Sequence, residues 1–353
     1  MSWLRPLLVA AAVLLAVAPL PAAWIEELYS RGLYLAVQNA VTPLTGAAPI
    51  ALFDVLLVAL CAGVAWRWWV CVGRARRGGR LRAVLGAGWD TAVLLAAVYL
   101  VFLLVWGFNY RREPLGAALG FDAARVTPQA VAALAGESVE RLNVLHAPAH
   151  RQSWSSLDGM PDRLGAAFER VQRQLGITPV AAAGPPKRTL LAPYFRQAGI
   201  DGMVSPFSLE ILVNGAVLPF ERPYVVAHEW AHLAGYADES EASFVGWLTC
   251  LAGDDASRYS AWLYLAPQLV RHLGEEERNR VWRALEPGPA DDLRAVAART
   301  SEAVPIVRRN ASRVYDQYLR ANRVESGVAS YGKVVDLVLG TRDWWDAPLA
   351  DSP

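Results

Sequence analysis

Residues 226–238 read V-A-H-E-W-A-H-L-A-G-Y-A-D and contain an H-E-x-x-H motif made of His228, Glu229 and His232. Two histidines four positions apart on a helix lie on one face, so both imidazoles can bind the same metal ion. The glutamate between them then lies close to the open coordination position, where it can take a proton from water. The motif therefore predicts a Zn2+ site with His228 and His232 as ligands and Glu229 as the catalytic base.

The sequence around the motif predicts a helix with both ends marked. Pro223 suits the first turn, because its ring fixes φ for a helix and its missing N–H is not needed there. Gly235 follows the last periodic residue, where a helix stop is expected. The motif should thus lie on a helix of about three turns. The plainer alternative is a partly buried helix whose two histidines are only hydrogen-bonded.

A catalytic zinc site takes three protein ligands and keeps a fourth position for water. Asp238 lies six residues after His232, a spacing at which some zinc proteases place the third ligand. Asp238 also suits the N-cap of the next helix, with Glu241 as its capping-box partner. Glu239 would then lie on the first turn of that helix, so all three acidic residues stay candidates.

The stretch E-S-E-A-S at 239–243 resembles the E-x-x-A-(D/N) pattern of the gluzincins, a class of zinc proteases. In that class the first glutamate binds zinc and the last residue supports a ligand from outside the coordination shell. The resemblance implies Glu239 as the third ligand, followed by Glu241 and Asp238. It also implies that Ser243 hydrogen-bonds a ligating histidine.

Composition indicates a membrane protein. The chain has 353 residues, of which 54% are hydrophobic and 19% charged, against roughly 45–50% and 25% in soluble domains. The apolar excess lies in the first 107 residues. The net charge of +1 argues against a nucleic-acid partner, because no basic excess is present to neutralise phosphates.

Three apolar runs predict transmembrane helices at about 4–23, 49–72 and 84–106. The first run could instead be a cleaved signal peptide, since Pro21-Ala22-Ala23 resembles a cleavage site, but further spans follow and we favour the uncleaved helix. Asp54 and Asp90 lie near span ends, where interfacial placement is expected.

A basic loop between the second and third runs predicts the orientation of the chain. It contains five arginines and no acidic residue: Arg74, Arg76, Arg77, Arg80 and Arg82. Such a loop stays in the cytoplasm by the positive-inside rule, which places everything after Asn109 outside. The amphipathic segment at 24–41 should lie along the outer membrane surface or pack under the catalytic domain.

Cysteine usage predicts neither a disulfide nor a cysteine metal site. Cys61 and Cys71 fall in the membrane region, and Cys250 stands alone outside it. A domain of this size can be stable without disulfides. His146 and His150 are also four apart, but Pro148 makes a shared helical face doubtful. We therefore expect surface or loop histidines there, rather than a second metal site.

A β-hairpin is predicted directly before the motif. Residues 207–213 alternate apolar and polar side chains, Asn214-Gly215 is a strong turn signal, and 216–220 would form the returning strand. One of these strands could pair with an extended substrate. After the motif, helices are expected at 257–273, kinked or split at Pro267, and at 275–285, 291–303, 305–322 and 329–339.

These patterns predict a mainly α protein in two parts. Residues 1–110 would form a membrane anchor with three transmembrane helices. Residues 111–353 would form an α-rich, zincin-like metallopeptidase domain with a small β-hairpin or sheet beside the H-E-x-x-H helix.

Six stretches in order along the chain carry a family resemblance: Y-S-R-G-L-Y at 29–34, W-G-F-N-Y-R-R-E-P-L at 106–115, S-P-F-S at 205–208, H-E-W-A-H-L-A-G-Y-A-D-E-S-E-A-S-F at 228–244, R-Y-S at 258–260 and S-G-V-A-S-Y at 326–331. The chain resembles the domain-of-unknown-function 3810 family of bacterial membrane proteins. In that family position 238 is commonly basic and both glutamates are retained, which implies Glu239 or Glu241 rather than Asp238. The family has Asn where this chain has Ser243.

Together these observations predict a zinc-dependent metallopeptidase in the bacterial inner membrane, with its active site outside the cytoplasm. Its partners would be the lipid bilayer and peptide or protein substrates in the cell envelope. Three residues of the family stretches could stabilise the oxyanion: Tyr331, Tyr259 and Arg258. The alternative is a non-catalytic membrane protein with a structural or vestigial metal site. An intramembrane protease is disfavoured, because charged residues bracket the motif too closely for a span of about 20 residues.

Overall fold

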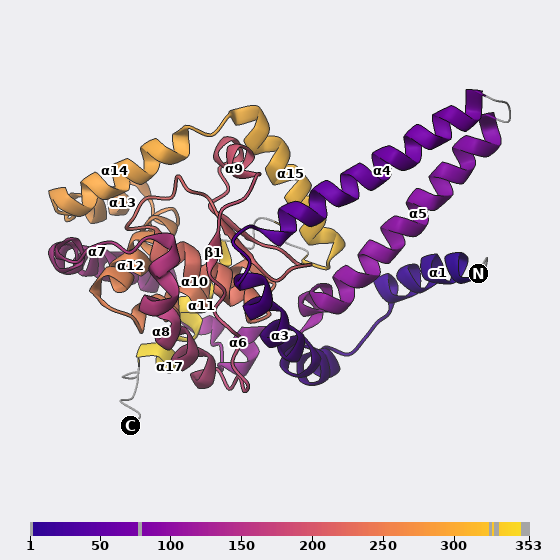
Figure 1. The fold of residues 1–353 in the computed structure, drawn as a ribbon. Helices are drawn as coiled ribbons and strands as arrows, with labels where there is room; N and C mark the ends of the chain where they lie inside the picture. The colour runs from indigo at the N-terminus through magenta and orange to yellow at the C-terminus, as the bar shows by residue number, and fades with distance from the viewer. Residues whose placement is uncertain (1–2, 77–79, 325–326, 328–331, 347–353) are drawn as a thin grey trace.

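The computed structural model describes residues 3–76, 80–324, 327 and 332–346, and it is mainly helical with one small sheet. A long pair of antiparallel helices projects from a helical body that surrounds the motif helix (Figure 1). The N-terminal helices are α1 (Leu4–Val17), α2 (Ala22–Trp24), η1 (Ile25–Leu33), α3 (Tyr34–Gly46), α4 (Leu52–Arg76) and α5 (Arg80–Val105). Those of the body are η2 (Gly107–Arg111), α6 (Leu115–Ala118), η3 (Ala123–Arg125), α7 (Pro128–Arg151), η4 (Leu157–Gly159), α8 (Met160–Gln174), α9 (Ala192–Ala198), α10 (Arg222–Leu233), α11 (Glu239–Leu251), α12 (Asp255–Val270), α13 (Glu275–Arg283), α14 (Pro287–Ser301), α15 (Pro305–Ala321), α16 (Val334–Gly340) and α17 (Arg342–Asp346).

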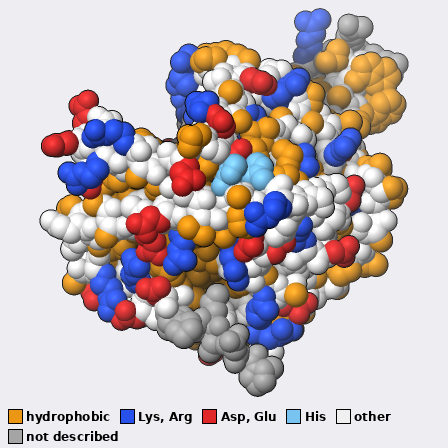
Figure 2. Space-filling view, turned by 90° about the vertical axis from the view of Figure 1, so that its left-hand side faces the viewer, with side chains coloured by type: hydrophobic (Ala, Val, Ile, Leu, Met, Phe, Trp, Pro, Cys, Tyr) orange, Lys and Arg blue, Asp and Glu red, His pale blue; other side chains and the backbone are white. Residues whose placement is uncertain are grey.

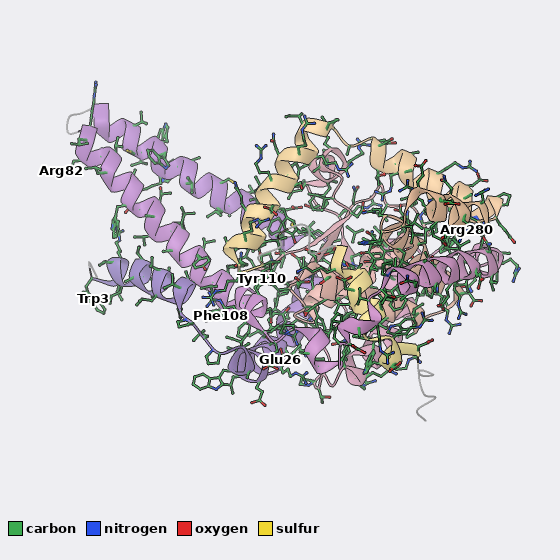
Figure 3. The ribbon with its side chains drawn as sticks, turned by 180° about the vertical axis from the view of Figure 1, so that it is seen from behind. Trp3, Glu26, Arg82, Phe108, Tyr110 and Arg280 are labelled. Atoms are coloured by element: carbon green, nitrogen blue, oxygen red, sulfur yellow. The ribbon has the colours of Figure 1, made fainter. Side chains whose placement is uncertain are left out.

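The projecting helices α4 and α5 correspond to the predicted second and third spans. Their apolar stretches cover Leu52–Gly73 and Arg80–Val105, and only 6% and 11% of the tested windows are buried inside the protein. So much exposed apolar surface on two long helices indicates membrane association. Figure 3 shows Arg82 at the tip of this pair and Phe108 and Tyr110 at its base. Residues 77–79 of the basic loop, including Arg77, lie outside the described part of the chain.

The helix predicted at 4–23 is interrupted at residues 18–21. Helix α1 ends at Val17, and Ala18 takes an extended ψ of 124°. The physical reason is Pro19, because a proline disfavours helical geometry in the residue before it. The next helical segment, Ala22–Gly46, is bent by 113° from α1, so this region forms a third span only if the bent pair counts as one.

The amphipathic segment packs against the body, which was the second of its two predicted positions. The Tyr34 hydroxyl donates to the Leu233 carbonyl on the motif helix. Gln38 donates to the Ala182 carbonyl and accepts from the Ala182 N–H. The division into 1–110 and 111–353 stays a prediction, although buried residues from both parts share one hydrophobic core.

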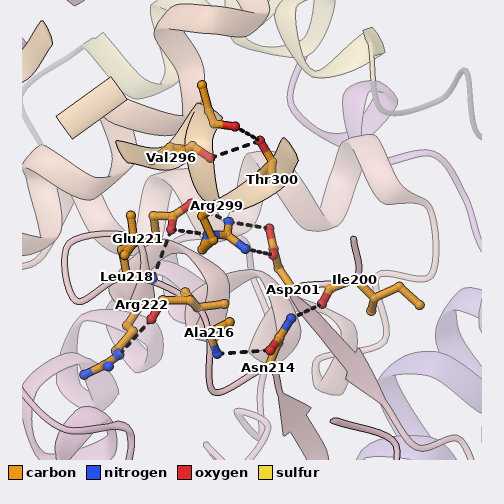
Figure 4. Close-up of polar contacts among 12 residues, drawn as sticks. Ile200, Asp201, Asn214, Ala216, Leu218, Glu221, Arg222, Val296, Arg299 and Thr300 are labelled. Atoms are coloured by element: carbon orange, nitrogen blue, oxygen red, sulfur yellow. Dashed lines mark hydrogen bonds and ion pairs between the residues drawn. The ribbon is translucent and has the colours of Figure 1, made fainter. Parts of the chain in front are cut away.

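The sheet has three short strands in the order β1 (Pro186–Lys187), β3 (Ile211–Val213) and β2 (Gly202–Val204). Strand β3 pairs parallel to β1 and antiparallel to β2. The predicted returning strand at 216–220 is therefore wrong, as is the start of the first strand at 207. The Asn214 side chain explains the difference (Figure 4). Its amide accepts from Ala216 N–H and donates to the Ile200 carbonyl, which pairs the turn with the preceding segment.

The helices after the motif agree with the predicted periodicity in type and order. The main difference concerns α12, which continues through Pro267 without being split. The last predicted helix, at 329–339, begins at Val334 within the described residues.

Candidate metal centre

Helix α10 carries the motif and has the predicted ends. Pro223 lies in its first turn, and the chain leaves the helix through Gly235, whose φ is +86°. A positive φ is strained for residues with a side chain, so glycine suits this stop. The Tyr236 N–H donates to the Ala231 carbonyl and closes the helix end.

Helix α11 brings Glu239 to the two motif histidines. Its Oε2 atom lies 3.3 Å from His228 Nε2 and 3.4 Å from His232 Nε2. The two helices approach closely because α11 has a glycine at the crossing, where a Cβ at Gly246 would lie 2.8 Å from the His228 backbone nitrogen. His228, His232 and Glu239 thus form a group that could hold a metal ion.

The donor atoms of this group fit a zinc ion. Zinc bonds of about 2.0–2.2 Å at tetrahedral angles place two ligand atoms roughly 3.3–3.5 Å apart. The separations of 3.3 and 3.4 Å between Glu239 Oε2 and the two histidine Nε2 atoms agree with this range. Within the described part of the chain, Glu239 Oε2 is buried and makes no hydrogen bond of normal geometry. A buried acceptor without a donor is unfavourable, and a cation between the three residues would satisfy it.

The other two acidic candidates lie away from this group. The Asp238 carboxylate accepts from the Ser240 and Glu241 N–H groups as the N-cap of α11. Glu241 accepts from the Leu115 N–H at 2.6 Å and so faces the start of α6. The structure therefore places only Glu239 beside the two histidines.

Outer hydrogen bonds orient all three side chains. His232 Nδ1 lies 2.7 Å from the Tyr236 carbonyl, to which its N–H donates, leaving Nε2 free as a ligand. Ser243 Oγ lies 3.4 Å from His228 Nδ1, as expected from the sequence. The Tyr315 hydroxyl of α15 donates to Glu239 Oε1, the oxygen that faces away from the histidines.

Burial and mutual charge set the protonation of the group. Burial raises the pKa of Glu229 to about 8. Burial would also raise the pKa of Glu239, but the adjacent His232 and His228 hold it well below its usual value. Burial opposes the charged form of His232, but the nearby Glu239 carboxylate outweighs this effect and raises the pKa of His232 to about 9. The pKa of His228 is lowered, because burial dominates there. The anionic Glu239 therefore favours a cation at this position.

Glu229 points toward strand β2. A Cβ at Gly202 would overlap the Glu229 carboxylate, so the glycine allows the strand to approach. Glu229 Oε2 is buried and accepts no hydrogen bond from any described residue. The carboxylate thus has a free acceptor oxygen, as a proton-accepting group requires.

The base of the α4–α5 helix pair also reaches the site. Trp106, directly after α5, is buried and packs edge-on against the His232 ring, with 6.2 Å between centroids. Tyr110 donates to the Tyr318 hydroxyl at 3.3 Å, and Tyr318 stacks on Tyr315. The apolar helices and the candidate metal centre are therefore one packed unit.

The two expected oxyanion donors that the structure describes, Tyr259 and Arg258, bond other groups. Tyr259 donates to Asp292 at 2.6 Å, and Arg258 is bonded to the Leu251 carbonyl at the surface. Tyr331 lies outside the described residues. Sequence reasoning missed Tyr315, because nothing in the local pattern of α15 distinguishes this tyrosine from other helical aromatic residues.

Surface or loop histidines were expected at His146 and His150, and the structure agrees with the first description and corrects the second. Helix α7 runs from Pro128 to Arg151 and includes Pro148, so both histidines lie on a helix rather than in a loop. Their rings face each other with 4.3 Å between centroids. A proline removes one backbone donor, which the helix tolerates here close to its end.

A comparison with protein families identifies the family to which this chain belongs. The family described as "Protein of unknown function (DUF3810)" matches residues 29–339. The chain belongs to the DUF3810 family. No curated protein and no solved structure matches it. The matched region of this DUF3810 protein contains α3 to α15, all of α16 except Gly340, and all residues of the candidate metal centre.

Substitution of Gly246 by alanine is expected to destabilise this DUF3810 protein by about 1–3 kcal/mol, because the new Cβ would press on the α10 backbone. Thermal unfolding in detergent, followed by circular dichroism, measures the effect. Gly136→Ala is the matched control, since Gly136 lies within α7 with open space around it. That change should be neutral or stabilising by up to about 1 kcal/mol. Equal melting temperatures for the two variants would contradict the tight crossing.

Tyr315→Phe is expected to weaken zinc affinity roughly 10–100-fold, because it removes the donor that orients Glu239. Competition with a chromophoric chelator measures the affinity. Tyr318→Phe is the control, because its hydroxyl bonds Tyr110 instead. An unchanged affinity in Tyr315→Phe would show that Glu239 needs no such support.

Proposed function

We propose that this protein is a membrane-anchored, zinc-dependent metallopeptidase with His228, His232 and Glu239 as zinc ligands. The observation that carries the proposal is the convergence of these three donors beside a buried glutamate with a free oxygen. A purely structural zinc site fills its coordination sphere with protein ligands and needs no base. Here three candidate ligands and an adjacent Glu229 match the composition of a hydrolytic site.

The chemistry divides between the ion and the protein. When bound, zinc supplies Lewis acidity that polarises a carbonyl group and makes water more acidic. Glu229 is proposed to take the proton from the attacking water through its free carboxylate oxygen. The same carboxyl group then delivers that proton to the nitrogen of the leaving amine. Burial of Glu229 supports this role, because it raises the affinity of the carboxylate for the proton.

Strand β2 is proposed to hold the substrate. The Asp201 main-chain carbonyl accepts from the Asn214 N–H, and the Ser205 N–H donates to the Glu210 carbonyl. Residues 201 and 205, on either side of β2, thus bond the residues that flank β3. In an antiparallel pair the residues between them direct their main-chain groups to the other side. The N–H and C=O groups of Gly202 and Val204 therefore face the open edge of the sheet. An extended peptide added at this edge would run beside Glu229.

The location is proposed from the apolar helices and the basic loop. The loop between α4 and α5 would stay in the cytoplasm of a bacterial cell, which places the metal centre on the outer side of the inner membrane. Substrates would then be peptides or proteins of the cell envelope. Alkaline phosphatase fused to the C-terminus of the full chain should be active, because that reporter needs an oxidising compartment.

The direct test uses the purified full-length protein with zinc and a mixed library of unstructured peptides. Mass spectrometry of the products should show cleavage that a zinc chelator stops and added zinc restores. One bound zinc at this centre without any cleavage would favour the non-catalytic alternative, in which the ion only holds α10 and α11 together.

A further inference from the structure

We propose that His146, His150 and Asp292 form a second metal site, which binds a divalent transition-metal ion such as Zn2+ and joins helices α7 and α14. This site is separate from the proposed hydrolytic centre and does not depend on it. Its three ligand atoms lie within 4.8 Å of one another. Imidazole and carboxylate ligands together suit zinc and related ions.

Both histidines approach the same carboxylate oxygen. His150 Nε2 lies 2.8 Å from Asp292 Oδ2, and His146 Nε2 lies 3.7 Å from it. These distances lie on either side of the roughly 3.3–3.5 Å expected between two ligands of one tetrahedral zinc ion. Small rotations of the two rings would therefore bring all three atoms into coordination.

Burial and a hydrogen bond from Tyr259 fix the Asp292 side chain in position. Its side chain is only 11% exposed, and its Oδ2 accepts from the Tyr259 hydroxyl of α12 at 2.6 Å. Carboxylates that bind metals are commonly fixed by such an outer hydrogen bond. The opposite side is open, because the His146 and His150 side chains are 26% and 32% exposed. Figure 2 shows histidine side chains reaching the surface on the side of the molecule where α7 and α14 lie. An ion can thus enter from solvent, and water can complete its coordination.

The backbone of α14 is also adapted to His146. A Cβ at Gly288 would overlap the His146 ring, so a glycine at this position lets the helix start close to α7. A hydrogen-bonded chain from Tyr259 through Asp292 to His150 would not need His146 at all. A shared ion explains why the second imidazole also turns toward Asp292 and lies against the first ring.

The position of the site suggests what the ion does. Gly288, which lies against the His146 ring, is at the first end of α14, and Arg299 is near the other end. Arg299 pairs with Asp201, next to β2, and with Glu221, next to the motif helix (Figure 4). A metal at the first end would fix α14 and so support the ion pairs at the second end.

Zinc titration of the full-length protein by calorimetry tests this proposal. We expect two zinc ions per chain in the wild type, one in His146→Ala and one in His232→Ala, with none in the double variant. Asp292→Asn should also lose one ion, although its amide oxygen can still accept from Tyr259. Loss of the ion in both variants would therefore not be explained by misfolding of one of them. The control is His272→Ala, which removes an exposed histidine in the turn after α12 and should keep both ions.

Cobalt gives an independent readout. Co2+ bound to the His232→Ala protein should show visible absorption bands that disappear when His146 is also replaced. Zinc should in addition raise the melting temperature of the His232→Ala protein, since a ligand that binds only the folded state stabilises it. Unchanged zinc stoichiometry in both His146→Ala and Asp292→Asn would overturn the second site. Because these measurements need no substrate, they stand apart from any failure to find peptidase activity.

Discussion

His232→Ala is expected to lower the zinc content of the purified protein by one ion per chain. The imidazole supplies one of three converging donors, and its Nδ1–H is already committed to the Tyr236 carbonyl. Loss of this ligand leaves two donors, too few to hold zinc against water at ordinary concentrations. Glu239→Ala should lower the content equally, because within the described residues Glu239 is the carboxylate that groups with both histidines as a possible metal ligand. Elemental analysis after gel filtration measures the content.

Glu241→Gln is the matched control for this experiment. Glu241 belongs to the same helix and is also buried, but it accepts from Leu115 N–H rather than facing the histidines. Glutamine keeps an oxygen for that bond, so the zinc content should stay at the wild-type value. Zinc retained in Glu239→Ala but lost in Glu241→Gln would reverse the assignment of the third ligand.

Glu229→Gln is expected to reduce peptide hydrolysis roughly 10²–10⁴-fold while zinc stays bound. The amide cannot accept the proton of the attacking water, yet it keeps nearly the same volume in the space left by Gly202. The expected loss is therefore in kcat, with KM changed little, because the substrate contacts remain. Initial rates on a peptide identified from the library measure the effect.

Two comparisons make this result specific. Zinc content must equal that of the wild type, which separates loss of the base from loss of the metal. Glu241→Gln should keep full activity, since that carboxylate lies outside the site. If Glu229→Gln hydrolysed the peptide at the wild-type rate, the assignment of Glu229 as the base would be wrong.

Local patterns in the sequence determined much of the architecture. Apolar periodicity predicted the order of the helices, because burial of one helical face depends on residues three or four apart. Pro223 and Gly235 predicted the ends of α10, since φ preferences act on single residues. The H-E-x-x-H spacing brings His228 and His232 to one face, because residues four apart on a helix lie one above the other. The helix predicted at 4–23 ends early, at Val17, because Pro19 disfavours helical geometry at Ala18.

Only the tertiary structure decided which distant groups meet. Three acidic residues after Gly235 were candidates in the sequence, and only a resemblance to the gluzincin pattern ranked Glu239 first. The crossing of α10 and α11 at Gly246 brings the Glu239 carboxylate to the two histidines. Tyr315 reached that glutamate from α15, 76 positions along the chain. The open edge of β2 likewise follows from pairing with β3, not from alternation within 207–213.

The second candidate metal site, at His146 and His150, shows the same difference between local spacing and distant contacts. Their spacing was visible in the sequence, but the ligand that makes them a candidate site, Asp292, is 142 positions away from His150 on another helix. Short-range spacing determines which side chains share a face. Contacts between helices depend on the packing of the whole core, where many weak apolar contacts fix each crossing, and no local pattern encodes them.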